Sequence, residues 1–114
     1  MGSWVPINAR WYKGPVELPF HWNLDDSAIT YFSFDVQPAI LSNDQILQVW
    51  MSEFDVIREW GALVNITLHP QLIGRPSRTV LMRRFLEHMK SFDDVWFATG
   101  TQVAEAFEVF ETSI

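Results

Sequence analysis

The chain of 114 residues has a formal net charge of −6, is 48% hydrophobic and contains six tryptophans but no cysteine. This length suits a single domain with its own core, and the aromatic content excludes a disordered chain. The net negative charge, with no basic run longer than Arg83-Arg84, argues against a protein that binds the phosphate backbone of nucleic acid through charge.

Without cysteine the chain has no disulfide framework, no thiolate metal site and no cysteine nucleophile. This composition is compatible with the cytoplasm, where we expect the protein. The first residues lack the pattern of a secretory signal, and no apolar run is long enough to cross a membrane. We therefore expect no membrane partner.

The first part of the chain predicts little regular structure. Residues 1–15 mix aromatic residues with proline and glycine, which indicates an irregular arm of a single domain over 1–114. Alternating apolar and polar residues predict a short strand over 16–18. Residues 20–26 would form the loop at its exit, and the aromatic stretch 27–41 a packed loop.

The best-defined helix begins after Ser42. Ser42 and Gln45 have the spacing of a capping box, in which each side chain accepts a hydrogen bond from the backbone of the other. Apolar residues recur at helical spacing from Ile46 to Ile57, and Gly61 is suited to end the helix.

Strands and helices alternate in the rest of the chain. The β-branched, apolar run 62–68 predicts a strand buried on both faces, and a helix is expected with Ser77 as its N-cap. A short buried strand over 95–98 precedes a last helix, which begins with a capping box at Thr99 and ends near Phe110. This order predicts an α/β fold of about three βα units with parallel strands, resembling a piece of a barrel.

Three such units leave two open sheet edges, because a complete (β/α) barrel usually needs about 250 residues. Open edges pair readily with other chains. We therefore expect a second subunit, more of a longer chain or self-association to cover them.

His69 is the leading candidate for chemistry, because it follows the strand 62–68 and parallel sheets collect functional groups at the carboxyl ends of strands. It suits a general acid, a general base or a metal ligand, or a histidine that is simply bonded to a backbone carbonyl. Asp25 or Asp26 at the adjacent strand end is suited to orient the imidazole. The alternative for this pair is an ordinary turn or helix cap.

Arg75 and Arg78 are suited to bind a carboxylate or an oxyanion, or else form a solvated pair near a helix start. His88 is expected to be exposed on its helix. The sequence contains no His-x-x-x-His, no Gly-rich phosphate loop and no Gly-x-Ser-x-Gly motif. A zinc site from His69, His21 and a carboxylate is disfavoured, so we expect no metal site in this chain alone.

The sequence ITLHPQLIGRPSR, over 66–78, resembles the polysaccharide deacetylase superfamily (NodB homology, carbohydrate esterase 4-like). It is most similar to the branch with allantoinase-like, cyclic-imide-hydrolase-like and peptidoglycan-deacetylase-like proteins. The likeness continues through VELPFHWNLDD at 16–26 and DVWFAT at 94–99, and so covers about the last hundred residues.

This resemblance implies a partial (β/α)7 barrel of the NodB type, of which this chain is the carboxyl-terminal portion. It implies that His69 is the catalytic acid toward the leaving amine. Trp22, Asp25 and Asp26 would line the substrate pocket, and Arg75 is a suspected substrate contact.

The family's aspartate pair and paired metal-binding histidines belong to an amino-terminal half that has no counterpart in these 114 residues. By resemblance the full domain uses zinc or another divalent metal to hydrolyse an amide C–N bond in an N-acetyl sugar, a ureide or an imide. We therefore expect this chain to be inactive alone, with a homo-oligomer or a complementary amino-terminal half as its partner. The alternative is a non-catalytic half-barrel module that acts by self-association or partner binding.

Overall fold

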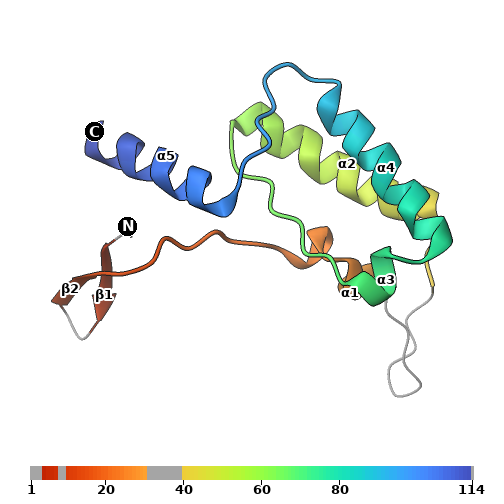
Figure 1. The fold of residues 1–114 in the computed structure, drawn as a ribbon, viewed down its shortest axis with the longest axis horizontal. Helices are drawn as coiled ribbons and strands as arrows, with labels where there is room; N and C mark the ends of the chain where they lie inside the picture. Colours follow the sequence, from red (N-terminus) through yellow and green to blue (C-terminus); the bar gives the residue numbers. More distant parts are fainter. Residues whose placement is uncertain (1–3, 8–9, 31–39, 114) are drawn as a thin grey trace. The chain divides into compact units, whose positions relative to one another are not determined.

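The computed structural model describes residues 4–7, 10–30 and 40–113, which fall into two compact units (Figure 1). Unit 1 comprises residues 1–19 and 96–114, and unit 2 comprises residues 20–95. Unit 2 contains every candidate site residue that the sequence suggests.

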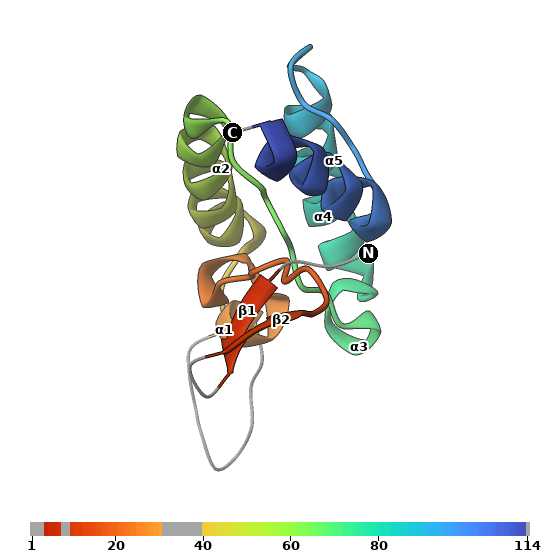
Figure 2. The same ribbon diagram turned by 90° about the vertical axis from the view of Figure 1, so that its left-hand side faces the viewer.

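Unit 2 is built on two long helices, α2 and α4, that pack side by side (Figures 1 and 2). The short helices α1 and α3 lie against each other, and the 3₁₀ helix η1 contacts α2. The elements are η1 (Trp22–Leu24), α1 (Asp26–Thr30), α2 (Asn43–Trp60), α3 (Pro70–Ile73) and α4 (Pro76–Lys90). In the part of the chain that the structure describes, no helix combines the length and apolar character that a membrane span requires.

Helix α2 begins and ends as its sequence predicts. The Ser42 N–H donates to Gln45 Oε1 over 2.9 Å and the Gln45 N–H donates to Ser42 Oγ over 3.3 Å, so the capping box is formed. Gly61 ends the helix with φ of 65°, a left-handed conformation that glycine adopts at little cost.

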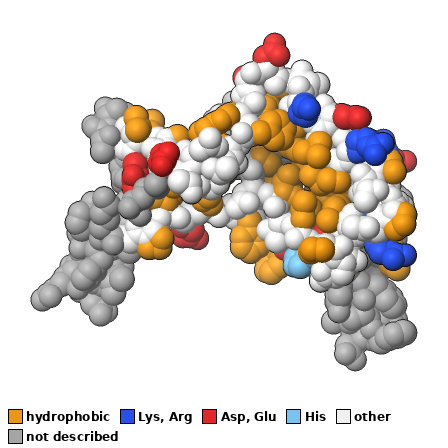
Figure 3. Space-filling model, in the orientation of Figure 1, with side chains coloured by type: hydrophobic (Ala, Val, Ile, Leu, Met, Phe, Trp, Pro, Cys, Tyr) orange, Lys and Arg blue, Asp and Glu red, His pale blue; other side chains and the backbone are white. Residues whose placement is uncertain are grey.

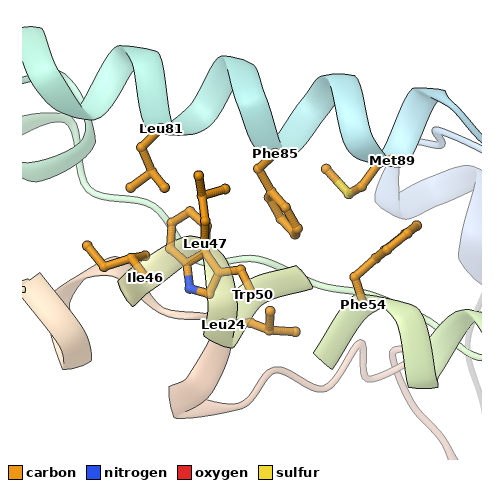
Figure 4. Packing of buried hydrophobic residues seen from close by; sticks show 8 residues of the cluster. All are labelled: Leu24, Ile46, Leu47, Trp50, Phe54, Leu81, Phe85 and Met89. Carbon is orange, nitrogen blue, oxygen red and sulfur yellow. The ribbon is translucent and has the colours of Figure 1, made fainter. Parts of the chain in front are cut away.

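The core of unit 2 lies between α2, α4 and η1. Figure 4 shows its eight buried apolar residues, with Phe85 of α4 directed toward the side chains of α2. The ring centroids of Trp50 and Phe85 are 5.4 Å apart, and those of Phe54 and Phe85 are 6.3 Å apart. The residues are Leu24, Ile46, Leu47, Trp50, Phe54, Leu81, Phe85 and Met89.

Helix α4 begins two residues earlier than the sequence suggests. Arg75 is the N-cap and Pro76 the first helical residue, so the expected N-cap, Ser77, lies inside the helix. Proline suits this first position, since its φ is already helical and its missing N–H would have no partner within the helix.

The expected strands over 16–18, 62–68 and 95–98 are not formed in the described part of the chain. In their place, unit 2 has one isolated parallel bridge between Asp25 and Thr67. A strand requires a hydrogen-bonded neighbour, and among the described residues the segment 62–68 forms only this β-bridge. The prediction of three formed βα units therefore needs correction, and the (β/α)7 barrel stays a prediction.

Unit 1 contains a hairpin where the sequence suggested an irregular arm. Strands β1 (Trp4–Ile7) and β2 (Arg10–Lys13) pair antiparallel, with Trp4 opposite Lys13 and Ile7 opposite Arg10. Both strands are rich in aromatic and β-branched residues, which favour paired strands over an irregular chain.

The last helix of the chain, α5 (Gly100–Ser113), begins as the sequence predicts. The Thr99 N–H donates to Gln102 Oε1 over 2.8 Å, and the Gln102 N–H donates to Thr99 Oγ1 over 3.2 Å. These reciprocal bonds satisfy two donors that a helix start otherwise leaves unpaired.

We expect Phe85→Ala to lower the free energy of unfolding by about 3–5 kcal/mol, because it leaves a cavity between α2 and α4. Phe85 is fully buried, whereas the adjacent Leu86 is 36% exposed. Leu86→Ala is therefore the matched control and should cost less than about 1 kcal/mol. Urea denaturation followed by tryptophan fluorescence measures both, and equal losses would contradict the position of the core.

We expect Ser42→Ala to lower the free energy of unfolding by about 1 kcal/mol, because the Gln45 N–H loses its acceptor. Ser52→Ala in the middle of α2 is the control. Ser52 Oγ donates to the Gln48 carbonyl, and alanine at that position raises helix propensity, so its effect should be near zero or stabilising. A larger loss for Ser52→Ala in the same denaturation experiment would speak against the capping role.

Candidate functional site

The candidate site begins with His69, the residue that directly follows the segment 62–68. His69 has an extended backbone (φ −117°, ψ 124°) and is the N-cap of α3, whose first residue is Pro70. Because Pro70 has no backbone N–H and a helical φ, the chain turns directly after His69. The imidazole is thereby held at a sharp change of chain direction, with 37% of its side chain exposed.

A second segment brings two carboxylates to the same place. Asp25 is the C-cap of η1, and Asp26 begins α1. The Thr67 N–H donates to the Leu24 carbonyl over 2.9 Å, and the Asp26 N–H donates to the Thr67 carbonyl over 3.1 Å. This parallel bridge aligns the pair of aspartates with the end of the 62–68 segment, where His69 lies.

Asp26 holds His69 through both of its carboxylate oxygens. The His69 backbone N–H donates to Oδ2 over 2.8 Å, and His69 Nδ1 lies 2.6 Å from Oδ1. A carboxylate only accepts, so this short contact requires the proton on Nδ1 and leaves Nε2 as the other functional nitrogen. Asp26 is fully buried, so water screens the attraction between its carboxylate and the imidazole only weakly.

Asp25 provides a second buried carboxylate that does not bond the imidazole. Its Oδ1 accepts from the Ser27 N–H over 2.8 Å and from Ser27 Oγ over 2.6 Å. The same oxygen lies 3.9 Å from His69 Nδ1, which is too long for a hydrogen bond but close enough for charge attraction.

The pKa of His69 is raised above its ordinary value of 6.5. The largest cause is the hydrogen bond to Asp26, followed by the opposing effect of desolvation and then by the charges of Asp26 and Asp25, which raise it. The site therefore favours the protonated imidazolium, which carries a donor on Nε2.

Asp25, Asp26 and His69 also form a group whose candidate ligand atoms lie within 4.8 Å of one another. A divalent cation does not fit this arrangement well. Both oxygens of Asp26 accept from His69, and Asp25 Oδ1 accepts two hydrogen bonds from Ser27. A bound cation would have to displace these hydrogen bonds, so the donor set suits a hydrogen-bonded acid better than a metal centre.

The other predicted site residues are less constrained. Trp22 opens η1 with 65% of its surface exposed and packs edge-on against Phe20, at a centroid distance of 6.1 Å. Arg75 is exposed at the start of α4, and its guanidinium makes no hydrogen bond or ion pair with the described residues. Both residues lie in unit 2 with His69: Trp22 is the first residue of η1, and Arg75 follows α3 in the chain.

Arg78, the other arginine suggested as an anion ligand, is occupied with other contacts. It donates to Asn43 Oδ1 over 2.9 Å and to the Leu41 carbonyl over 2.7 Å, and so ties α4 to the start of α2. His21 accepts from the Asn23 N–H over 3.2 Å as the cap of η1 and does not join the candidate group.

The expected exposure of His88 is wrong. Only 25% of its side chain is exposed, its Nε2 lies 2.8 Å from Asp55 Oδ1, and its ring packs edge-on against Phe54 and Phe92. Ser27 was missed as a site residue. The Asp-x-Ser spacing at 25–27 is the signal that would have found it, since aspartate often accepts from the residue two positions later.

No protein-family model matches the chain, whereas individual relatives do. A Schizosaccharomyces pombe protein named as a polysaccharide deacetylase is 30% identical over 100 residues, covering 83% of this chain and 30% of the relative. The peptidoglycan deacetylase of Helicobacter pylori is 31% identical over 100 residues, covering 81% of this chain and 33% of the relative.

Two solved structures share the fold. A protein of Mycobacterium smegmatis described as a polysaccharide deacetylase matches with a TM-score of 0.79 and 33% identity, over 87% of this chain and 35% of that one. A Pseudomonas aeruginosa structure with the same description matches with a TM-score of 0.61 and 30% identity, over 77% of this chain and 29% of that one. The chain thus spans about a third of the length of its relatives. The similarity in both sequence and structure, over this part of the relatives' length, supports a relationship of the chain to the polysaccharide-deacetylase-like superfamily.

Proposed function

We propose that the chain is the carboxyl-terminal portion of a polysaccharide-deacetylase-like hydrolase in which His69 is the general acid. One observation carries this proposal. Asp26, fully buried, accepts from both the backbone N–H and Nδ1 of His69, while the imidazole is more than a third exposed. A protonated imidazole held in this way presents its Nε2–H outward to a substrate.

The proposed chemistry is hydrolysis of an amide C–N bond. Water adds to the carbonyl carbon, the C–N bond breaks, and the nitrogen takes a proton from His69 Nε2 so that it leaves as an amine. An amide nitrogen is a poor leaving group until it is protonated, so an acid at this position lowers the barrier. The raised pKa of His69 favours the protonated imidazolium, the form that this step requires.

The relatives are named as polysaccharide and peptidoglycan deacetylases, which supports an N-acetylated sugar as the substrate class. Ureides and cyclic imides are the alternatives that the sequence resemblance implies. Trp22 is exposed beside Phe20 and offers an apolar surface for a sugar ring. Arg75 offers a guanidinium with no partner among the described residues, suited to an anionic or carbonyl group of the substrate. Asp25 would affect the reaction indirectly, because its charge favours the protonated form of His69.

An acid alone does not complete this reaction, because the attacking water also needs a base. The 114 residues contain no histidine pair of the His-x-x-x-His type. We propose that the base and the family's metal ligands come from a complementary part, corresponding to the length of the relatives that this chain does not span. The chain by itself would then be inactive.

We expect Asp26→Asn to lower the pKa of His69 toward its ordinary value of 6.5, because the neutral amide removes both the charge and the acceptor facing Nδ1. NMR titration of the imidazole resonances measures this. Asp55→Asn is the control, because Asp55 contacts His88 and should leave the His69 titration unchanged. An unchanged His69 pKa in Asp26→Asn would refute the pairing.

The same pair makes stability depend on pH. The folded-state pKa of His69 lies above its unfolded value, so the stabilisation is fully present below the unfolded pKa and lost as pH rises through the folded pKa. The advantage of the wild type over Asp26→Asn in urea denaturation should therefore shrink as pH rises through that range. A growing advantage would have the wrong sign for this pairing.

We expect the isolated 114-residue chain to release no acetate from chitin oligosaccharides, even with added zinc. Joined to the remaining part of the Mycobacterium smegmatis protein, in place of its matching third, the chain should gain this activity. His69→Asn should then lower the rate by about 10²–10⁴-fold, the usual contribution of a general acid. His88→Asn is the control and should change stability alone, whereas turnover by the isolated chain would overturn the need for a complementary part.

A further inference from the structure

The turn between α3 and α4 leaves no room for a side chain at Gly74. A Cβ atom on Gly74 would lie well inside van der Waals contact with the Pro70 carbonyl oxygen. The backbone of Gly74 (φ −76°, ψ −2°) is one that other residues also adopt, so space and not conformation requires glycine here. The Gly74 N–H donates to the same carbonyl over 3.0 Å, which holds the two groups together. Because the obstructing atom belongs to the backbone, a larger residue must displace the chain.

The displaced group would be the direct neighbour of the candidate acid. Pro70 follows His69 in the chain, and His69 is the N-cap of α3. The His69 carbonyl accepts from the Leu72 N–H over 2.9 Å and from the Ile73 N–H over 3.0 Å, so the whole of α3 is bonded to His69. Helix α3 has only four residues, and no further turn is present to absorb a displacement. A shift of the Pro70 carbonyl therefore passes to the backbone of His69.

The other side of Gly74 is held in place by α4. Leu81 and Phe85 of this helix are fully buried in the core, and Arg78 ties its first turn to the start of α2 through two hydrogen bonds. Figure 3 shows hydrophobic side chains gathered on the viewed face of unit 2, with lysine and arginine side chains mainly toward its rim. Because α4 is anchored by this packing, a displacement at Gly74 is taken up on the side of α3.

The contacts between His69 and Asp26 depend on the position of the His69 backbone. The His69 N–H lies 2.8 Å from Asp26 Oδ2, and Nδ1 lies 2.6 Å from Oδ1. Asp26 is not free to follow a shift, because it is fully buried and its own N–H donates to the Thr67 carbonyl over 3.1 Å. Hydrogen bonds weaken as donor and acceptor move apart, so a displaced His69 loses part of its hold on Asp26.

We propose that Gly74 is a positioning residue for His69. Without a Cβ atom, Gly74 lets the Pro70 carbonyl close over the turn, and this keeps α3 compact and the imidazole in contact with Asp26. The inference rests on the proposed function for its catalytic meaning, since positioning affects turnover only if His69 is the acid. The placement of the imidazole itself can be measured in the isolated chain, without any turnover.

Gly74→Ala and Gly61→Ala form a matched pair of variants, because each replaces a glycine that ends a helix. A Cβ atom on Gly61 meets nothing within 4 Å, but alanine is strained at its φ of 65°. We therefore expect Gly61→Ala to lower the urea midpoint and to leave the His69 imidazole unchanged. Gly74→Ala should separate Nδ1 from Asp26. NMR should report this as an upfield shift of the Nδ1 proton and a fall of the His69 pKa toward 6.5.

Two results would overturn the proposal. One is a folded Gly74→Ala variant whose Nδ1 proton and His69 pKa equal those of the wild type. The other is an equal change of both signals in Gly61→Ala, which would trace the effect to lost stability in general. Circular dichroism shows whether each variant is folded. If Gly74→Ala unfolds in buffer, trimethylamine oxide, which favours the folded state, allows the same spectra to be recorded.

The hybrid with the remaining part of the Mycobacterium smegmatis protein tests the catalytic consequence. Gly74→Ala should lower kcat by about 10²-fold, the usual cost of misplacing a reacting group by about 1 Å. KM should change less, because Arg75 belongs to the anchored α4, and Gly61→Ala should leave kcat unchanged. A wild-type hybrid without activity would count against the hydrolytic function alone, and the NMR spectra of the isolated chain would still decide whether Gly74 positions His69.

Discussion

The site depends on one backbone contact between parts of the chain that are far apart in sequence. The bridge between Asp25 and Thr67 consists of two hydrogen bonds, each worth about 1 kcal/mol net. That is too little to order the two segments by itself. Apolar packing supplies the rest, because Leu24 of the first segment is buried in the core and Val64 and Ile66 of the second segment pack against the same core. The geometry of the His69–Asp26 pair is therefore set by the packing of both segments against α2 and α4.

This dependence explains why Asp26 can remain buried. A carboxylate out of water is costly unless it is paired and hydrogen-bonded. Asp26 accepts from two donors of the same residue, one on the backbone and one on the imidazole. The pairing compensates the burial and also fixes the tautomer and orientation of His69. Because both roles depend on the same contacts, stability and proton affinity are coupled at this site.

The sequence predicts local features of this fold better than distant ones. The capping boxes at Ser42 and Thr99 were recognisable because each involves residues three positions apart. The strand over 62–68 was expected from its apolar, β-branched residues. A strand forms only beside a neighbour, however, and among the described residues this segment has a single β-bridge, at Thr67. The predicted strand ends suggested a pairing of His69 with Asp25 or Asp26, beside the alternative that the two aspartates form an ordinary turn or helix cap, and the structure forms the pair with Asp26. The choice of Asp26 over Asp25 needed the register of the bridge, which composition does not reveal.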